Sequence, residues 1–360
     1  MEVRNMFDIY KNKQVLVTGH TGFKGSWLTL WLLKIGAKVV GYALDPKTAK
    51  DNFVLCDLEN KIKDYREDIR DYQTLTKVFN KEEPEIIFHL AAQPLVLDSY
   101  ENPLYTIETN TQGTANVLEA FRHSKKSKIL IIITTDKVYE NLEWEWGYRE
   151  SDQLGGSDPY SASKAAAEVL ISSYQRSFFN VGGKKIVSVR AGNVIGGGDW
   201  SENRLIPDCV KAIEKNEKII IRNPNSTRPW QHVLEPLGGY LLLGQKLLEE
   251  SLLESGAWNF GPVFSNIITV EELVSEIINC FGYGEYEIRS NKNAPKESNF
   301  LSLDISKANR KLNWQPLLTF NETLKFTLQW YKNYKTNDIY KLCFDQIEEF
   351  ENLWKLRNGK

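Results

Sequence analysis

Tyr160 and Lys164 lie four positions apart in a stretch, 160–178, whose composition predicts a helix. At this spacing, two helical side chains share one face. A phenol has a pKa of about 10 and is a poor base at neutral pH, but a neighbouring ammonium group stabilises the phenolate and lowers that pKa. The pair therefore predicts a tyrosine that takes a proton from a hydroxyl group.

A second set of candidates, Thr135, Asp136 and Lys137, stands at the end of the apolar run 129–134. Side chains at the carboxyl ends of parallel strands face the ligand crevice. The Thr135 hydroxyl would orient the oxygen being oxidised, and Asp136 and Lys137 add two titratable groups beside it. Oxidation alone does not need this added pair, which therefore indicates a second proton transfer. Alternatively, Asp136 caps the following turn and Lys137 is a solvated charge.

Glycines recur at every third position, 19, 22 and 25, directly after the apolar run 14–17. A backbone that turns sharply and approaches a pyrophosphate needs glycine, and the following helix stabilises the phosphate charge at its N-terminus. The pattern predicts a dinucleotide site, against the alternative of a glycine-rich turn without a ligand. The candidate cofactor contacts in this segment are Gly19, Thr21, Gly22, Phe23, Lys24 and Gly25.

Asp45 lies 20 residues beyond Gly25, at the end of a second apolar run. An acidic side chain there accepts hydrogen bonds from ribose hydroxyls and repels a 2′-phosphate, which favours NAD over NADP. The nearby Lys47 and Lys50 count against this preference, and Asp45 before Pro46 is also typical of a turn. Further candidate cofactor contacts are Asp68, Ile69, Leu90, Ala91, Ala92, Gln93 and Thr134, together with Tyr160 and Lys164.

The first half of the chain alternates short apolar runs with longer helical stretches. The runs 14–17, 38–42, 86–89 and 129–134 predict strands, and the stretches 26–35, 72–80, 103–121 and 160–178 predict helices. Apolar runs without polar alternation are typical of a parallel sheet covered on both faces. The repetition predicts an α/β fold with a Rossmann-like, doubly wound parallel sheet.

The second half changes in texture after a further predicted strand at 185–190. Gly, Asn, Arg and Pro are frequent from 192 to 229, which predicts a smaller, interleaved C-terminal substrate-binding lobe. We assign 191–234 and 257–330 to this lobe. The NAD-binding domain then comprises 1–190 and the helical return 235–256, and 331–360 form a C-terminal helical extension.

Composition excludes several classes of function. A formal net charge of −2, with both signs scattered along the chain, gives no footprint for nucleic acid. We expect no membrane contact and a cytoplasmic location, because no apolar run approaches the roughly 20 residues that span a bilayer and the first residues resemble no signal peptide. The four cysteines and four histidines do not cluster at ligand spacing, so no metal site is expected.

These residues carry a resemblance to the extended short-chain dehydrogenase/reductase family, and within it to the nucleotide-sugar epimerases and dehydratases. It covers about the first 330 residues. The segments that carry it are GHTGFKGSW (19–27), AAQPLV (91–96), Asp136-Lys137, WEWGYRE (144–150), RAGNVIGGGDW (190–200), RPWQHVLEP (228–236) and WNFGP (258–262). Related dehydratases of dTDP-linked glucose carry Asp-Glu where this chain has Asp136-Lys137, and that lysine points to CDP-linked glucose (CDP-glucose).

The resemblance implies a lyase that removes water by internal redox chemistry with NAD. Tyr160 would take the proton from the hydroxyl on sugar carbon 4 while hydride passes to NAD. Asp136 would then protonate the departing hydroxyl on carbon 6, before hydride returns there. Lys137 would either remove the proton on carbon 5, for which its pKa must be lowered, or stabilise the enolate by its charge.

The resemblance also implies contacts with the nucleotide sugar from the second lobe: Asn193, Arg204, Arg228, His232 and Glu297. Arginine suits phosphate because its planar fork donates two hydrogen bonds. Trp230 and His232 would stack on the base or pack the lobe, and Arg190 is expected to form a structural ion pair. Relatives associate through helices that include the Tyr160 helix, so a homodimer or homotetramer is expected. The rival functions are a nucleotide-sugar 4-epimerase and a non-catalytic nucleotide-sugar binder.

Overall fold

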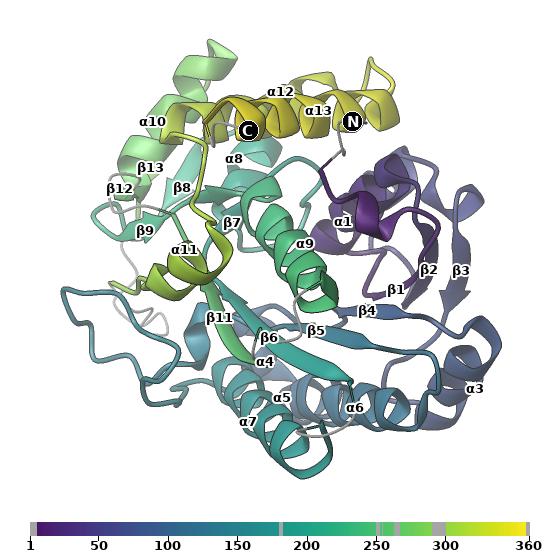
Figure 1. The fold of residues 1–360 in the computed structure, drawn as a ribbon. Coiled ribbons are helices and arrows are strands. Elements are labelled where there is room, and N and C mark those ends of the chain that lie inside the picture. The colour runs from purple at the N-terminus through teal and green to yellow at the C-terminus, as the bar shows by residue number, and fades with distance from the viewer. Residues whose placement is uncertain are drawn as a thin grey trace.

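A seven-stranded sheet forms the centre of the computed structural model, which describes residues 6–179, 183–249, 253, 255–262, 267–289 and 300–357 (Figure 1). All neighbouring strands of this sheet are parallel. Their spatial order is β11 (Gly256–Phe260), β6 (Lys185–Ala191), β5 (Ile129–Ile133), β4 (Ile86–His89), β1 (Gln14–Thr18), β2 (Lys38–Ala43) and β3 (Lys63–Arg66). The predicted doubly wound α/β fold is confirmed.

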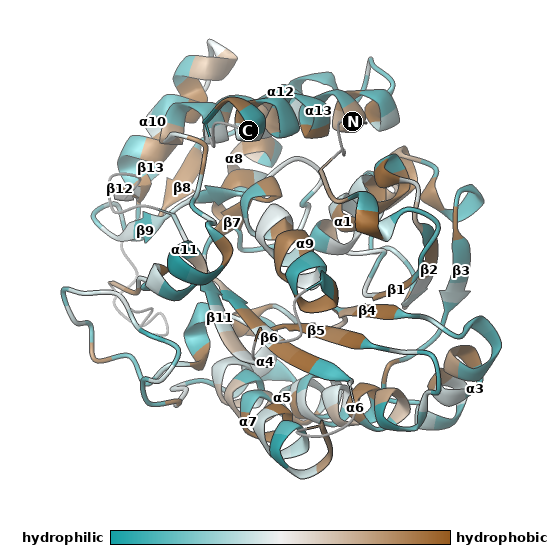
Figure 2. Cartoon of the chain, in the orientation of Figure 1, coloured by the Kyte–Doolittle hydropathy of each residue, from teal (hydrophilic) through white to brown (hydrophobic). Residues whose placement is uncertain are grey.

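Side chains of the central strands β1, β2, β4 and β5 enter two separate hydrophobic cores. On β5, Ile129, Ile131 and Ile133 belong to one core, and Leu130 and Ile132 belong to the other. Successive strand side chains point to opposite faces, so a strand buried on both faces must be apolar throughout. Figure 2 shows these central strands as almost continuously hydrophobic.

Helices cover both faces of the sheet (Figure 1). One core includes side chains of α1 (Phe23–Ile35), α9 (Leu234–Glu249), α12 (Phe320–Asn333) and α13 (Ile339–Arg357). The other includes side chains of α3 (Tyr72–Glu82), α6 (Gly113–His123) and α7 (Pro159–Tyr174). The sheet order reverses between β1 and β4, where a ligand crevice forms at the carboxyl ends of the strands.

The residues predicted to form the second lobe contain short strand pairs and helices. Its strands are β7 (Val194–Ile195) with β10 (Gln231–His232), β8 (Ile219–Ile221) with β13 (Tyr286–Ile288), and β9 (Thr227–Pro229) with β12 (Ile267–Thr269). Its helices are α8 (Leu205–Glu214), α10 (Val270–Phe281) and α11 (Ser306–Leu312). One assignment needs correction: β11, placed in this lobe from the sequence, pairs with β6 as the edge strand of the central sheet.

The C-terminal helices pack directly on the first domain. Glu351 of α13 accepts a hydrogen bond from the Trp31 indole at 2.8 Å and lies 3.0 Å from the Lys34 ammonium, both on α1. The predicted C-terminal extension is helical, but α12 begins before residue 331. The extension therefore packs against α1, the helix that follows the glycine-rich segment.

The predicted helix 103–121 contains a break. The structure has α5 (Pro103–Ile107), a π-helical turn (Glu108–Gln112) and α6, preceded by α4 (Val96–Glu101). The Asn110 amide in this turn donates to the Gln93 carbonyl at 3.0 Å and to the Ser163 hydroxyl at 2.9 Å. The wider turn thus places Asn110 between the loop after β4 and α7, as π-turns at functional sites often do.

A buried ion pair joins α7 to the sheet. The two carboxylate oxygens of Glu168 accept hydrogen bonds from Arg190 of β6, both at 2.9 Å, and the side chains are 4% and 3% exposed. Glu168 also accepts from Thr134 at 2.6 Å and Ser188 at 2.7 Å. The expectation that Arg190 forms a structural ion pair is confirmed.

We expect Glu168→Ala to destabilise the fold by about 3–5 kcal/mol, because it leaves the buried Arg190 charge without a partner. Urea unfolding followed by circular dichroism measures this change. The double variant Glu168→Leu/Arg190→Met removes both charges and should be less destabilised than the single variant. A Glu168→Ala protein as stable as the parent would contradict the role of the pair.

Candidate active site

The catalytic candidates at the end of β5 form one buried turn. Thr135 precedes a 3-10 turn (Asp136–Val138), and its hydroxyl donates to Asp136 Oδ1 at 2.9 Å. Burial raises the pKa of Asp136, while the Lys137 charge and the Thr135 hydrogen bond act in the opposite direction. The turn therefore holds a carboxyl group that keeps its proton more readily than an ordinary aspartate.

A glycine makes room for this carboxyl group. A Cβ on Gly192, which follows β6, would lie 2.6 Å from Asp136 Oδ2. Any larger residue would displace the aspartate from its position. Lys137 beside it is only half-buried, in contrast to Thr135 and Asp136.

The helix that carries Tyr160 starts at a well-formed cap. Asp158 accepts from the Ser161 backbone N–H at 2.9 Å, and Pro159 occupies the first helical position. Tyr160 is buried beside Thr135. Burial raises the pKa of Tyr160 to about 12, although a hydrogen bond with Thr135 and the charge of Arg204 act to lower it.

Lys164 shares the buried side of α7 with Tyr160, as the spacing predicts. Its ammonium group donates to the Ile133 carbonyl, the last of β5, at 3.2 Å. Burial lowers the pKa of Lys164 to about 8, with Glu168 opposing this effect. The predicted lowering of the Tyr160 pKa is not found, because desolvation of the phenolate outweighs the Thr135 hydrogen bond and the Arg204 charge.

Two more cations face the same turn. Arg204 immediately precedes α8 and donates to Asp199 Oδ2 at 2.7 Å. Burial, followed by the charge of Arg204, lowers the pKa of Lys24 to about 8, and Asp136 and Asp199 oppose this. Lys24, predicted as a cofactor contact, also interacts electrostatically with Asp136 and Lys164 of the predicted catalytic set. Arg204, predicted from the second lobe, interacts with both Lys24 and Tyr160.

The glycine-rich loop is shaped to receive a ligand. Gly19 has φ +74°, and a Cβ there would lie 2.6 Å from the Ala91 backbone nitrogen. Gly25 packs against the Gly19 carbonyl, so these two glycines serve the fold itself. Gly22 is exposed, and a Cβ would meet only the Gly19 oxygen, at 3.4 Å. The backbone at Gly22 is thus open at the start of α1, where a pyrophosphate binds.

The remaining loop contacts fix its shape. The Thr21 hydroxyl donates to the Leu44 carbonyl at 2.9 Å, and the Phe23 ring lies against Gly196. Leu90, Ala91 and Ala92 are half-buried after β4. The Gln93 amide donates to the Leu95 carbonyl and the Thr106 hydroxyl, so this side chain positions the loop.

The ribose end of the crevice is more exposed. The Asp45 side chain is 87% exposed, with Arg66 3.3 Å away. Asp68 pairs with Arg70 at 2.7 Å, and Ile69 is buried. The Thr134 hydroxyl, a predicted cofactor contact, donates instead to Glu168.

The predicted substrate contacts of the second lobe have different locations. Asn193 and Arg228 are half-buried, and the Asn193 carbonyl accepts from the Gln231 backbone at 3.2 Å. The structure does not support His232 as a substrate contact: its side chain is completely buried between Trp27 and Phe326, and burial lowers its pKa to about 3. Glu297 lies outside the described residues.

Sequence reasoning missed Asn110, Asp199 and Gly192 as residues that position the site. Asn110 is a polar residue inside a predicted helix, and the sequence does not single it out. Only the hydrogen bonds of its side-chain amide in the structure identify it. Asp199 and Gly192 belong to the segment 190–200, which the sequence analysis used only as part of the family resemblance.

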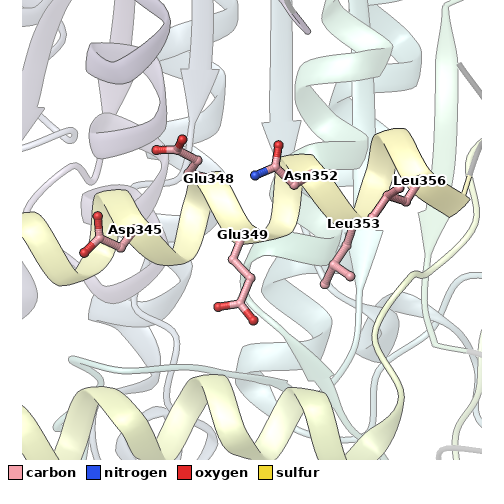
Figure 3. A pocket seen from close by; sticks show the side chains of 6 residues that line it. All are labelled: Asp345, Glu348, Glu349, Asn352, Leu353 and Leu356. Carbon is pink, nitrogen blue, oxygen red and sulfur yellow. The ribbon is translucent and has the colours of Figure 1, made fainter.

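Within the described ranges, no group of three or more His, Cys, Asp or Glu side chains is arranged to hold a metal ion. Nor does any helix in this part of the chain combine the length and apolar character needed to cross a membrane. An open hollow beside α13 is lined by Asp345, Glu348, Glu349, Asn352, Leu353 and Leu356 (Figure 3). It contains none of the predicted site residues, so it is separate from the crevice.

Comparisons with known proteins identify the family of the chain. The model of the family described as GDP-mannose 4,6 dehydratase matches residues 16–327. The chain is 46% identical to the CDP-glucose 4,6-dehydratase of Salmonella typhimurium over 341 residues, which cover 93% of this chain and 95% of that protein.

Two solved structures share the fold. An epimerase from Methanothermobacter thermautotrophicus has a TM-score of 0.79 and 26% identity, covering 93% of this chain and 96% of that one. The UDP-glucose 4-epimerase of Thermus thermophilus, in complex with NAD, has a TM-score of 0.75 and 25% identity, covering 89% and 99%. From the extent of the family match and the 46% identity, the chain belongs to the GDP-mannose 4,6 dehydratase family.

Proposed function

We propose that this protein is an NAD-dependent hydro-lyase that converts CDP-glucose to CDP-4-keto-6-deoxyglucose and water. The observation that carries this proposal is the buried Asp136, hydrogen-bonded to Thr135 at 2.9 Å and electrostatically coupled to Tyr160. An acid next to the tyrosine that takes the carbon 4 hydroxyl proton supplies what water elimination needs and simple oxidation does not. The 46% identity to a CDP-glucose 4,6-dehydratase supports the substrate.

NAD fits the crevice, because the exposed backbone at Gly22 and the exposed carboxylate of Asp45 meet the needs of a pyrophosphate and a ribose. When bound there, NAD would supply the hydride-transfer chemistry that links carbon 4 and carbon 6 of the sugar. Tyr160 takes the proton of the carbon 4 hydroxyl, and Thr135 orients that hydroxyl. Burial raises the pKa of Tyr160, and the Thr135 hydrogen bond and the Arg204 charge oppose this effect and so favour proton removal.

Asp136 is the general acid that protonates the departing hydroxyl on carbon 6. Its raised pKa favours this role, because a buried carboxyl group retains a transferable proton. Lys137 lies next to it, and its charge acts on the Asp136 carboxyl group. Two roles stay open for Lys137: removal of the proton on carbon 5, or stabilisation of the enolate that forms there.

The second candidate function is a nucleotide-sugar 4-epimerase, because solved epimerases share the fold. An epimerase needs Thr135, Tyr160 and Lys164 but has no use for a buried acid at Asp136. A non-catalytic nucleotide-sugar binder would not need Tyr160 and Lys164 buried side by side on α7. Both observations favour the dehydratase.

We also propose a cytoplasmic location and the two-domain division, with β11 moved to the NAD-binding domain.

We expect the purified protein to convert CDP-glucose, in preference to dTDP-, GDP- and UDP-linked hexoses, to a 4-keto sugar. The alkali-developed ultraviolet absorbance of the keto sugar measures this product. Formation of CDP-galactose without that absorbance would identify an epimerase. Binding of CDP-glucose without any product would identify the non-catalytic binder.

We expect Asp136→Asn to retain NAD binding and to slow water elimination by on the order of a hundredfold, the scale for loss of one general acid. In the parent, the elimination rate should fall as pH rises through the raised Asp136 pKa, because the protonated form is the active one. The variant should lack this pH dependence. Single-turnover product formation measures both effects, and Asp345→Asn, an exposed residue of α13, is the matched control. Unchanged elimination in Asp136→Asn would refute the acid role.

We further propose a homodimer formed through the outer faces of α5 and α7. These neighbouring helices expose large apolar side chains, with Leu104 74%, Ile107 45% and Val169 57% exposed. A contiguous exposed apolar patch is typical of an association surface. The face lies on the opposite side of the molecule from α13 (Figure 1).

We expect the parent to sediment as a dimer and the variant Leu104→Glu/Val169→Glu to sediment as a monomer, since buried charges oppose association. Leu356→Glu, which changes an equally exposed leucine on α13 (78% exposed), should remain dimeric. Analytical ultracentrifugation measures all three. A parent tetramer that falls to a dimer in the double variant would indicate a second interface, and a double variant of unchanged mass would exclude this one.

A further inference from the structure

A cation that the sequence analysis did not single out lies at the ribose end of the crevice. Arg66 is the last residue of β3 and pairs in register with Ala43, the last residue of β2. This register brings its guanidinium group to Asp45, two residues further along the chain. Arg66 Nη1 lies 3.3 Å from Asp45 Oδ1. Arg66 is 24% exposed, whereas Asp45 is 87% exposed, so the guanidinium lies beneath the carboxylate.

The other edge of the guanidinium is fixed by the protein. Arg66 Nε donates to both oxygens of Asp64, at 2.9 and 2.8 Å, and Nη2 donates to one of them at 2.7 Å. The face of the guanidinium stacks on the Phe53 ring at 4.7 Å. Glu59 lies 3.7 Å from Nη2. Arg66 therefore has one edge held in place and directs Nη1 toward Asp45.

Asp64 is fixed in turn by the glycine-rich loop. The buried His20 lies in that loop, and its Nε2 is 2.8 Å from Asp64 Oδ1. Burial alone would raise the pKa of Asp64, but the hydrogen bonds to His20 and Arg66 lower it to about 2. The carboxylate thus stays ionised and holds Arg66 at neutral pH. The guanidinium is preorganised by the same loop that receives the pyrophosphate.

Lys50, one of the lysines near Asp45 in the sequence, contacts other residues. The Lys50 ammonium group lies over the Trp200 ring at 4.8 Å and 3.6 Å from Glu214 of α8, which directs it toward the second lobe. Among the described residues, Arg66 is the cation that forms an ion pair with the Asp45 carboxylate.

We propose that Arg66 is a specificity-determining residue of the cofactor site, and that Asp45 masks it as a receptor for a 2′-phosphate. This inference rests on the proposed use of NAD. In the parent, Arg66 holds the Asp45 carboxylate in place to accept hydrogen bonds from the ribose hydroxyls. Without that carboxylate, a preorganised guanidinium faces the ribose, and guanidinium groups bind phosphate well. The choice between NAD and NADP is thus made by the Asp45–Arg66 pair, where the sequence alone pointed only to Asp45.

The test measures binding of NAD⁺ and NADP⁺ by isothermal titration calorimetry, after release of copurified nucleotide. Asp45→Asn should weaken NAD⁺ binding and tighten NADP⁺ binding by about tenfold or more, the effect of one charge-assisted hydrogen bond. Asp45→Asn/Arg66→Gln should lose the gain for NADP⁺. The matched control, Asp45→Asn/Lys50→Gln, should keep it. Arg66→Lys in the Asp45→Asn background keeps the charge without the fork and should retain only part of the gain.

The outcomes separate this inference from the proposed function. NADP⁺ binding that is unchanged in Asp45→Asn, or a gain that survives Arg66→Gln, overturns the role of Arg66 while NAD⁺ use stands. If Asp45→Asn/Lys50→Gln loses the tighter NADP⁺ binding instead, that binding is due to Lys50, and the role of Arg66 is overturned. A parent protein that binds neither nucleotide overturns the proposed function as well. Circular dichroism of each variant confirms that the fold is retained, and Arg66→Lys keeps the test decisive if Arg66→Gln fails to fold.

Discussion

The geometry of the crevice depends on the carboxylate of Glu168. Its oxygens bind Thr134 at the end of β5, Ser188 and Arg190 of β6, and its backbone belongs to α7. Through this single group, the helix that carries Tyr160 and Lys164 is fixed against the strand that leads to Thr135 and Asp136. A carboxylate buried this deeply is stable only if its charge and all its lone pairs are satisfied, and the four donors meet that condition.

Arg190 extends this constraint to the edge of the sheet. Its guanidinium donates to the Tyr139 hydroxyl at 2.7 Å, and that hydroxyl donates to Asn259 of β11 at 2.8 Å. The Asn259 backbone N–H donates to Glu150 at 2.9 Å, which ties the segment after the catalytic turn to the same network. The catalytic turn, α7 and the edge strand therefore cannot shift independently. This arrangement suits a reaction in which several side chains must face one sugar ring at the same time.

The sequence was sufficient for the parts of the fold that depend on local pattern. Strands with continuous apolar residues, such as β5, were predicted to within a residue of their ends. β11 was not predicted as a strand, because Asn259 interrupts its apolar pattern. The Asn259 side chain accepts a hydrogen bond from the Tyr139 hydroxyl and donates one to the Tyr148 carbonyl. For His232, the sequence left a substrate contact and packing of the lobe open. Only the tertiary structure shows that the side chain is buried. For Lys24, the sequence motif predicted a cofactor contact but could not show the electrostatic interactions with Arg204 and Asp136, which come from distant segments.

The electrostatics of the crevice indicate that it is completed by its ligands. Three cationic side chains, Lys24, Lys164 and Arg204, share the site with two carboxyl groups, Asp136 and Asp199. Burial lowers the pKa of Lys24 and Lys164 to about 8, which is the response of ammonium groups that lack sufficient negative charge nearby. Under the proposed function, the diphosphate of the substrate would bring negative charge to this region and favour the charged forms of these ammonium groups. For Lys164, Glu168 already opposes the effect of burial, so the carboxylate that fixes α7 also favours the charged form of the lysine on the Tyr160 helix.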